Sequence, residues 1–475
     1  MNNESTLSNR TDSVNESFEA TMTWRDALSL AVALPASALA VIGYWTGALG
    51  GWAAITLLAI SSMIAILQNF LYAEMSSMFP DRSGGVAVYA FEAWKDIFRP
   101  IGALAAAGYW IGWSFGLAAN ALVIGELVQA QWFSSSGTLE LGFLELGLGH
   151  LIAVATLAIV WLLNVFGIKP AVRVSYVVNA LVIAVMVAVL AASLIQGKLN
   201  LSNLTWSLDS SDAPAFVVAC VWLFLMGWTV YGTEIAATFT PEYRDPRHDV
   251  PKALTAAGLS SLAIFILMPL VAAGTVGEAE IASNPLGFNV VLFDALFGSA
   301  GSLAIVVLCL AMLNLMSVAT ADSGRALFGM ARSGLTIRQL GILNRAHVPA
   351  RAMTVGLVIN IGLVLLIGNL LGVIFASNLG YMIAVVFALS GYVLLRRADI
   401  TPDRKFRLPR IWNLIAIALT LVNLTFLLVA ATHPALTGYG GWKEEIIGFS
   451  VLALALAMYW YRRAVQDRGV PSMQK

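Results

Sequence analysis

Charged residues are scarce in this chain of 475 residues, since only 11% are Asp, Glu, Lys or Arg, whereas an ordinary soluble domain carries roughly 25%. Hydrophobic residues make up 59% of the sequence, and its mean hydropathy is +0.81. A soluble fold needs a polar surface, and 27 basic plus 27 acidic side chains cannot cover so much apolar chain. The composition therefore excludes a water-soluble globule and predicts a protein that lies mostly in lipid.

Cysteine and histidine are also rare, which argues against several kinds of site. The two cysteines, Cys220 and Cys309, lie inside apolar runs and predict small core residues rather than a disulfide scaffold or a thiolate metal site. The four histidines lie near the ends of apolar segments, without the paired spacing of a zinc enzyme. We therefore expect no metal and no cofactor, and the net charge of zero gives no reason to expect a nucleic acid partner.

Apolar segments recur along the chain, and most are long enough for the roughly 20 residues that a membrane-spanning helix needs. Residues 1–23 precede them and are rich in Ser, Asn, Thr and Glu, without the basic start of a signal peptide, so we predict a disordered cytosolic tail. A second cytosolic tail is predicted at 464–475. Twelve spans are predicted near residues 26–49, 52–78, 101–133, 149–168, 173–196, 214–239, 253–276, 301–331, 352–370, 372–395, 411–432 and 446–462.

The basic residues are divided unequally between alternate connections. The N-terminal tail and the connections before span 1 and after spans 2, 4, 6, 8, 10 and 12 hold 25 of the 27 Lys and Arg residues. The opposite connections hold only Lys198 and Lys443. The positive-inside rule therefore places both termini in the cytoplasm and the chain in the cytoplasmic membrane. Between spans 7 and 8, residues 281–297 are only moderately apolar and predict an external loop with a short surface helix, a possible lid.

Two spans carry residues that interrupt helices. Span 1 has Pro35 at mid-depth, where it removes the hydrogen bond to the carbonyl of Ala31 and disfavours helical backbone at Leu34. Span 6 has two glycines, Gly227 and Gly232, on either side of residues with poor helix propensity. The two spans open two five-helix blocks of opposite direction, 24–197 and 212–397, followed by two accessory helices within 398–463. Interrupted helices at equivalent places in inverted repeats predict a transport site near the membrane midplane.

Several short motifs occur in a fixed order along the chain. Span 2 ends in Tyr72-Ala73-Glu74 with Pro80 six residues after the glutamate, followed by Gly84-Gly85 and Tyr89. Span 6 carries Gly232-Thr233-Glu234 and continues into Glu242, Asp245-Pro246 and Val250-Pro251-Lys252-Ala253. Span 5 is preceded by Asn164-Val165-Phe166-Gly167, and span 8 ends in Arg325 to Leu335. In this order the motifs resemble the amino acid–polyamine–organocation permeases.

The resemblance implies a twelve-helix secondary transporter with a leucine-transporter-type 5+5 inverted repeat, and not an enzyme. It implies that Ala36-Ser37-Ala38 forms a bend that cradles a substrate carboxylate, and that Trp228 stacks on the substrate or gates the pocket. Tyr231 and Gly232 match the unwound segment that receives the substrate's amino group. Such a protein moves a small amino acid by alternating access. The alternative of the same fold is a polyamine or monoamine carrier, favoured if the bend cannot hold a carboxylate.

Coupling to an ion is less defined by the sequence. Many proton-coupled members of the resembled family carry a lysine in span 5, where this chain has Val182, which leaves exchange, facilitated transport or a sodium site. Buried charge is costly in a membrane, so Glu234 predicts a group that couples protonation to gating or anchors the bend. The hydroxyls of Ser317 and Thr320 in span 8 are candidates for a cation site.

Two further polar positions in span 3 have open interpretations. Asn120 is predicted to contact the substrate or to form a helix–helix hydrogen bond. Trp113 is predicted to be a packing or interfacial residue. The sequence makes no prediction of the oligomeric state. A channel is disfavoured because no filter-like repeat is present.

Overall fold

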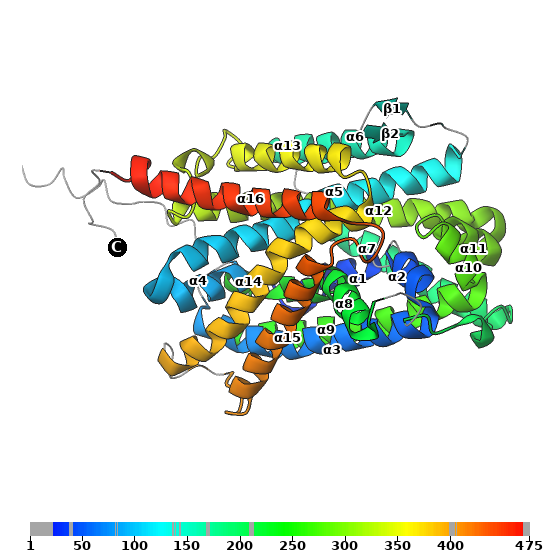
Figure 1. The fold of residues 1–475 in the computed structure, drawn as a ribbon, viewed down its shortest axis with the longest axis horizontal. Helices are drawn as coiled ribbons and strands as arrows, with labels where there is room; N and C mark the ends of the chain where they lie inside the picture. Colours follow the sequence, from blue (N-terminus) through cyan, green and yellow to red (C-terminus); the bar gives the residue numbers. More distant parts are fainter. Residues whose placement is uncertain are drawn as a thin grey trace, which may run out of the picture.

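The computed structural model describes residues 22–37, 41–80, 82, 84–134, 137, 139–141, 144–167, 172–208, 213–398, 404 and 406–468. Most of both predicted tails and Ala38 lie outside these residues. The helices of the first half are α1 (Trp24–Ser37), α2 (Ile42–Leu49), α3 (Gly51–Met78), α4 (Gly85–Phe98), α5 (Pro100–Trp132), α6 (Leu148–Val165) and α7 (Val172–Ile195). Those of the second half are α8 (Ala215–Tyr231), α9 (Pro246–Val276), α10 (Glu278–Ser283), α11 (Phe288–Phe297), α12 (Gly301–Arg332), α13 (Ala350–Leu366), α14 (Leu370–Ala398), α15 (Trp412–Thr432) and α16 (Trp442–Tyr461) (Figure 1).

Short elements complete the chain. They are the 3₁₀ helices η2 (Leu201–Asn203), η3 (Gly232–Ala237), η4 (Thr240–Glu242), η5 (Gly298–Ala300) and η6 (Arg338–Leu340), the π-helical turn η7 (Arg462–Gln466), and the strands β1 (Leu139–Leu141) and β2 (Leu144–Leu146). The strands pair antiparallel in a small hairpin, the only sheet in the described part of the chain. In that part, ten helical segments are long and apolar enough to cross a membrane, and α13 is a shorter apolar helix. The predicted all-helical polytopic membrane protein is therefore confirmed in this coarse form.

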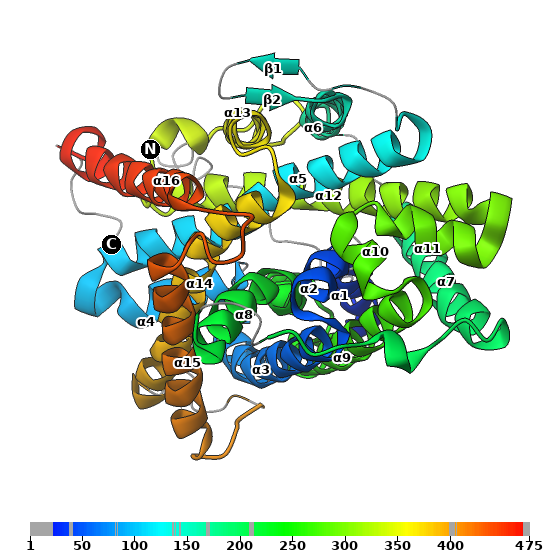
Figure 2. The ribbon, with the colours of Figure 1, turned by 45° about the vertical axis from the view of Figure 1, so that its right-hand side comes forward.

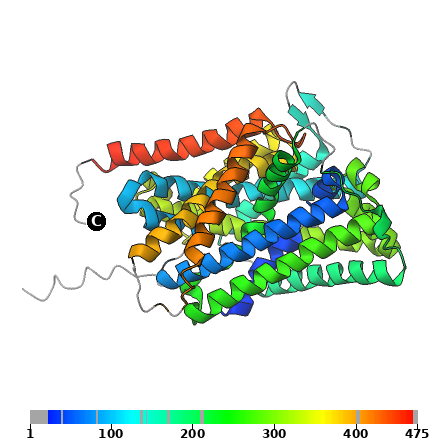
Figure 3. The ribbon, with the colours of Figure 1, turned by 60° about the horizontal axis from the view of Figure 1, so that its bottom comes forward.

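Burial divides the helices into a centre and a periphery. In the apolar windows of α5 and α14, 89% and 83% of the residues are buried inside the protein, against 33% and 28% in α15 and α16. Peripheral helices expose large apolar side chains, such as Val177 and Val187 of α7, which suits a surface that faces lipid tails rather than water. Figures 2 and 3 show α16 along one side of the bundle, with α3, α7 and α9 on another.

The two central helices approach each other closely through glycines. A Cβ atom added to Gly108 of α5 would lie 2.3 Å from the carbonyl oxygen of Gly380, and one on Gly380 would lie 3.1 Å from the carbonyl oxygen of Gly108. Small residues are the usual means by which membrane helices bring their backbones together. This contact holds α5 and α14 in fixed register at the middle of the molecule.

We expect Gly108→Ala to destabilise the protein by about 1–3 kcal/mol, because the added methyl group meets backbone that cannot rotate away. The matched control is Gly362→Ala on α13, where an added Cβ has no heavy atom within 4 Å. There the better helix propensity of alanine gives a change of about 1 kcal/mol or less in the stabilising direction. Thermal unfolding of the two purified variants measures the difference. Equal melting temperatures would contradict the close contact.

The connections fall into two sets at opposite ends of the bundle. At one end, the backbone N–H of Met22 donates to Glu242, Asn344 donates to the carbonyl of Val165, and Arg338 pairs with Asp467 at 2.8 Å. At the other end, the N–H of Trp52 donates to Thr205 and that of Asn200 to Gly274. The basic connections of the sequence thus share one end, which is called the basic end below.

The break in span 1 lies further along the chain than the position of Pro35 predicts. Helix α1 continues through Leu34 and Pro35 to Ser37, and α2 starts only at Ile42. The prediction that Leu34 leaves the helical region is therefore wrong, because a membrane helix tolerates the loss of the single hydrogen bond that proline removes. The second half of span 1, α2, begins at Ile42.

The sequence correctly predicts a break in span 6 at Gly232 but not at Gly227. Helix α8 runs without interruption through Gly227 to Tyr231, and the backbone then tightens to a 3₁₀ helix that starts at Gly232. Gly227 serves packing instead, since a Cβ atom there would lie 2.5 Å from Cε of Met382. The predicted opening of the backbone at Gly227 is therefore wrong, whereas Gly232 marks the change of helix type.

The predicted external loop contains two short helices rather than one. α10 and α11 lie within residues 278–297, and α10 packs against α2. The contact is tight, because a Cβ atom on Gly43 of α2 would lie 1.9 Å from the carbonyl oxygen of Pro285. The loop therefore covers the half of span 1 that lies away from the basic end.

Candidate functional site

A cavity lies between the central helices at the middle of the bundle. Its walls come from α5, from the α8–η3 junction, from α12 and from α14, and Gly116 in its wall is the midpoint of α5. Helix α1 packs against η3 and α12. The lining residues are Gly112, Trp113, Gly116, Asn120, Trp228, Thr229, Gly232, Leu315, Ala319 and Tyr381.

The cavity is narrow. It measures about 520 Å³ including its opening, but the centre of a water molecule fits in only about 40 Å³ of it. A cavity in which the centre of a water molecule can occupy about 10–15 Å³ holds one water molecule. A solute larger than a few water molecules therefore requires the wall to move.

The indole of Trp228 crosses from α8 to the opposite wall. Its Nε1–H donates to Oγ of Ser377 at 2.9 Å and to the carbonyl oxygen of Gly112 at 3.2 Å. The hydroxyl of Ser377 in turn donates to Gly112 at 3.1 Å. The ring packs over Gly116, where an added Cβ atom would lie 3.2 Å from Cζ2 of Trp228. Trp228 thus joins α8 to α5 and α14 across the cavity.

Several buried polar atoms gather at this cavity without a hydrogen-bond partner among the described residues. They include Nε1 of Trp113, Oγ1 of Thr229, the hydroxyl of Tyr381 and both carboxylate oxygens of Glu234. Glu234 lies in η3 and is 1% exposed, and the polar atoms of Tyr381, Tyr109 and Trp113 face it. Buried polar groups in proteins are nearly always satisfied, so this set suits a polar solute entering the cavity.

The structure brings together three of the predicted span 3 and span 6 residues. Asn120, Trp228 and Gly232 line the cavity. The amide of Asn120 donates to the carbonyl of Gly116 one turn earlier, at 2.7 Å. Tyr231 is not among the lining residues, and its ring lies close to Gly227 on its own helix.

The predicted bend in span 1 is described only in part. Ala36 and Ser37 are the last two residues of α1, and Ala38 lies outside the described residues. Their contact with a substrate carboxylate remains a prediction.

The two predicted cation ligands of span 8 bond elsewhere. Oγ of Ser317 accepts a hydrogen bond from Asn164 of α6 at 3.2 Å, and Oγ1 of Thr320 donates to Met316 on its own helix at 2.8 Å. Neither residue lines the cavity. Among the described residues, no group of three or more His, Cys, Asp or Glu side chains is placed to hold a metal ion.

The sequence reasoning missed part of the wall. Trp113 was predicted to be a packing or interfacial residue but lines the cavity, and Ser377 and Tyr381 of α14 had no predicted role. Each of these three residues carries a polar group within an apolar span, which marks it as a candidate. Only the packing of α14 against α5 shows which face of each helix is turned inward.

The chain matches known transporters along most of its length. The family model described as "Amino acid permease" matches residues 22–453. The chain is 24% identical to "Uncharacterized transporter Rv1999c" of Mycobacterium tuberculosis, over 87% of this chain and 84% of the relative. It is 22% identical to "Amino-acid permease RocE" of Bacillus subtilis, over 66% of each chain. It is 21% identical to "Lysine-specific permease LysP" of Escherichia coli, over 64% of this chain and 62% of the relative.

Proposed function

Because the chain belongs to the amino acid permease family, we propose that it is a secondary transporter that moves a small amino acid across the cytoplasmic membrane by alternating access. In this proposal the chain has twelve spans, with two inverted blocks at 24–197 and 212–397. The basic end faces the cytoplasm, as the positive-inside rule requires. The helices of spans 1, 2, 6 and 7 rock as one group against the other helices.

The observation that supports this function most is the position of the cavity. It lies at mid-depth beside the junction of α8 and η3, and α1 packs against η3 and α12. Interrupted membrane helices at such a place supply backbone groups that a zwitterion can bond. Trp228 closes the cavity and would add a cation–π attraction of about 0.5–2 kcal/mol to an ammonium group.

An amine carrier is the second candidate, and the charge around the cavity favours it. No lining residue is charged, and Glu234 faces two residues of the wall without a basic partner bonded to it among the described residues. A carboxylate in such a place attracts an ammonium more than it attracts a second carboxylate. A cationic amino acid fits both candidates, and one relative is named a lysine-specific permease.

Glu234 is also our candidate for coupling transport to protons. The lysine that many members of the family carry in span 5 is replaced here by Val182, and the buried Glu234 faces Tyr381 and Trp113, which line the cavity. A sodium site at Ser317 and Thr320 is the alternative, because a hydroxyl that donates its proton along its own helix, as Thr320 does to Met316, keeps its lone pairs for a cation.

A thermal-shift screen of the purified protein tests the substrate class. A ligand that binds only the folded state stabilises it by about 2.7 kcal/mol at a concentration of 100 Kd. We expect amino acids to raise the melting temperature more than their decarboxylated amines, and competition of labelled uptake in proteoliposomes to give the same order. A larger effect of the amines would favour the second candidate. No shift and no uptake with either class would contradict both.

A further inference from the structure

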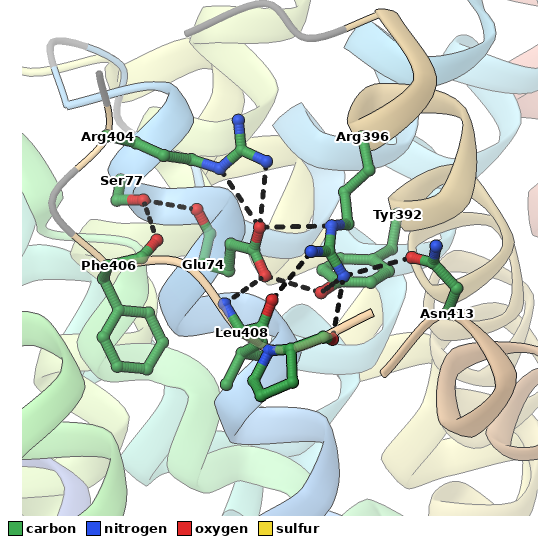
Figure 4. Close-up of polar contacts among 9 residues, drawn as sticks. Glu74, Ser77, Tyr392, Arg396, Arg404, Phe406, Leu408 and Asn413 are labelled. Atoms are coloured by element: carbon green, nitrogen blue, oxygen red, sulfur yellow. Dashed lines mark hydrogen bonds and ion pairs between the residues drawn. The ribbon is translucent and has the colours of Figure 1, made fainter. Parts of the chain in front are cut away.

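We propose that Glu74, Arg396 and Arg404 form a clamp that holds the cytoplasmic end of the transport pathway closed and sets how readily it opens. This inference rests on the proposed function for its orientation and for the helices that move. The three residues and their hydrogen-bond partners are called the Glu74 clamp (Figure 4). They act at a distance from the cavity, as positioning residues for the transport cycle.

The centre of the clamp is a carboxylate without access to solvent. The side chains of Glu74 and Arg404 are 0% exposed, and that of Arg396 is 8% exposed. Oε1 of Glu74 lies 3.1 Å from Nε of Arg404, 3.0 Å from its Nη2 and 3.4 Å from Nε of Arg396. Oε2 accepts from the hydroxyl of Tyr392 at 2.6 Å and from the N–H of Leu408 at 3.1 Å.

Arg396 also fastens the segment that leads to α15. Its Nη2 donates to the carbonyl of Leu408 at 2.7 Å, and its Nη1 lies 3.3 Å from the carbonyl of Pro409 and 3.2 Å from Oδ1 of Asn413. On the other side of the segment, the hydroxyl of Ser77 donates to Phe406 at 3.2 Å. The clamp therefore joins three parts of the chain, namely the end of α3, the end of α14, and Arg404 with residues 406–413.

The place of the clamp in the packing argues for a role in motion. Helix α3 packs mainly on α9 and α8, whereas α14 packs mainly on α5, α15 and α4, and the two touch each other little. At this end of the bundle the clamp is thus a polar joint between two helices that otherwise touch little, although α8 packs on both α14 and α15. In the proposed cycle α3 belongs to the moving group and α14 to the stationary one.

The chemistry of the joint suits repeated opening. One carboxylate and two guanidinium groups are desolvated together, and the cost of removing them from water offsets much of their attraction. When the helices part at the basic end, water entering from the cytoplasm hydrates the same charges. Such a joint is specific when closed, yet its opening is not opposed by exposure of apolar surface. A purely apolar contact would lack this property.

Labelling of a single cysteine in the cavity tests the proposal without any substrate. The reporter is Ala319→Cys, made in a protein in which Cys220 and Cys309 are replaced by alanine. The probe is a membrane-impermeant maleimide, applied from the cytoplasmic or the external face of vesicles. We expect Glu74→Gln to raise the labelling rate from the cytoplasmic face at least about tenfold. The labelling rate rises in proportion to the fraction of molecules whose cavity is open to the cytoplasm. Tyr392→Phe removes the bond that the hydroxyl donates to Glu74 and the one that it accepts from Arg396 at 3.1 Å, but it leaves the carboxylate paired with both arginines, so it gives a smaller rise. Glu74→Asp restores part of the wild-type rate.

The control is Glu278→Gln, the same change at the opposite end. Glu278 accepts from Gly51 and from Thr205, whose N–H lies 2.7 Å away, and we expect labelling from the cytoplasmic face to stay unchanged. In transport assays, opening of the clamp raises the KM for external substrate more than it lowers the maximal rate. Because labelling needs no substrate, it still decides the matter if no transported amino acid is found.

Two results would overturn the clamp. The first is a folded Glu74→Gln protein that labels at the wild-type rate from the cytoplasmic face. The second is an equal rise from both faces, which would mean that the residues only stabilise the fold. Should Glu74→Gln fail to fold, Tyr392→Phe decides alone, and a wild-type labelling rate in that variant refutes the proposal.

Discussion

Replacing Trp228 with alanine is expected to abolish saturable uptake, with a fall of about two orders of magnitude or more in kcat/KM. The indole is the group that crosses the cavity, through bonds from Nε1 to Ser377 and Gly112 and through packing over Gly116. Without it, α8 loses its connection to the opposite wall, and the cavity loses the side chain that closes it. Initial rates of labelled uptake into proteoliposomes, measured over a range of concentrations, test this.

Two further variants make the result for Trp228 specific. Trp132→Ala removes an indole that is 46% exposed at the end of α5, and it should leave uptake close to the wild-type level. Trp228→Phe keeps an aromatic face but loses the N–H donor, so the protein should still bind the substrate but no longer close the cavity over it. Gel filtration and melting temperature confirm folding, since Trp228 is partly buried and loss of a fully buried tryptophan costs about 3–5 kcal/mol. Unchanged kinetics in a folded Trp228→Ala protein would remove this residue from the site.

The second large effect is expected at Glu234. Glu234→Gln keeps the shape of the side chain but removes its ability to change charge, at a site where a charge is costly. The groups that face Glu234 are the uncharged donors of Tyr381, Tyr109 and Trp113, with no basic side chain among them. We expect uptake driven by a pH gradient to fall at least about tenfold, while exchange of labelled for unlabelled substrate continues.

Measurement of both modes in the same proteoliposomes separates coupling from binding. The control is Glu280→Gln, which changes an exposed carboxylate on α10 and should alter neither mode. A Glu234→Gln protein with the pH dependence of the wild type would show that protons are coupled elsewhere or not at all. Loss of both modes would instead make Glu234 part of substrate binding.

The spans were predictable because length and apolarity are local properties of the chain. The predicted 52–78 and 301–331 differ from α3 and α12 by one residue at most at each end. The helix breaks were less predictable. Whether Gly227 opens a helix or admits a neighbour depends on Met382, a residue from another helix that no local pattern reveals.

The candidate site was predictable only on the chain segments that carry recognisable motifs. Asn120, Trp228 and Gly232 lie at the cavity as expected, whereas Tyr381 and Ser377 come from α14, whose inward face is set by packing. The Glu74 clamp shows the same limit. Glu74 belongs to a recognisable motif, but its partner Arg404 lies 330 residues further along the chain, and the sequence gives no sign of that pairing.

The meeting of Gly108 with Gly380 has a consequence for selectivity. Gly112 and Ser377, which receive the indole of Trp228, lie about one helical turn from this contact on their respective helices. Because the two backbones are in direct contact there, that side of the cavity is rigid. A larger substrate is therefore accommodated by displacement of α8 or α12, the walls opposite this contact, and the range of substrates depends on how far these two helices can move.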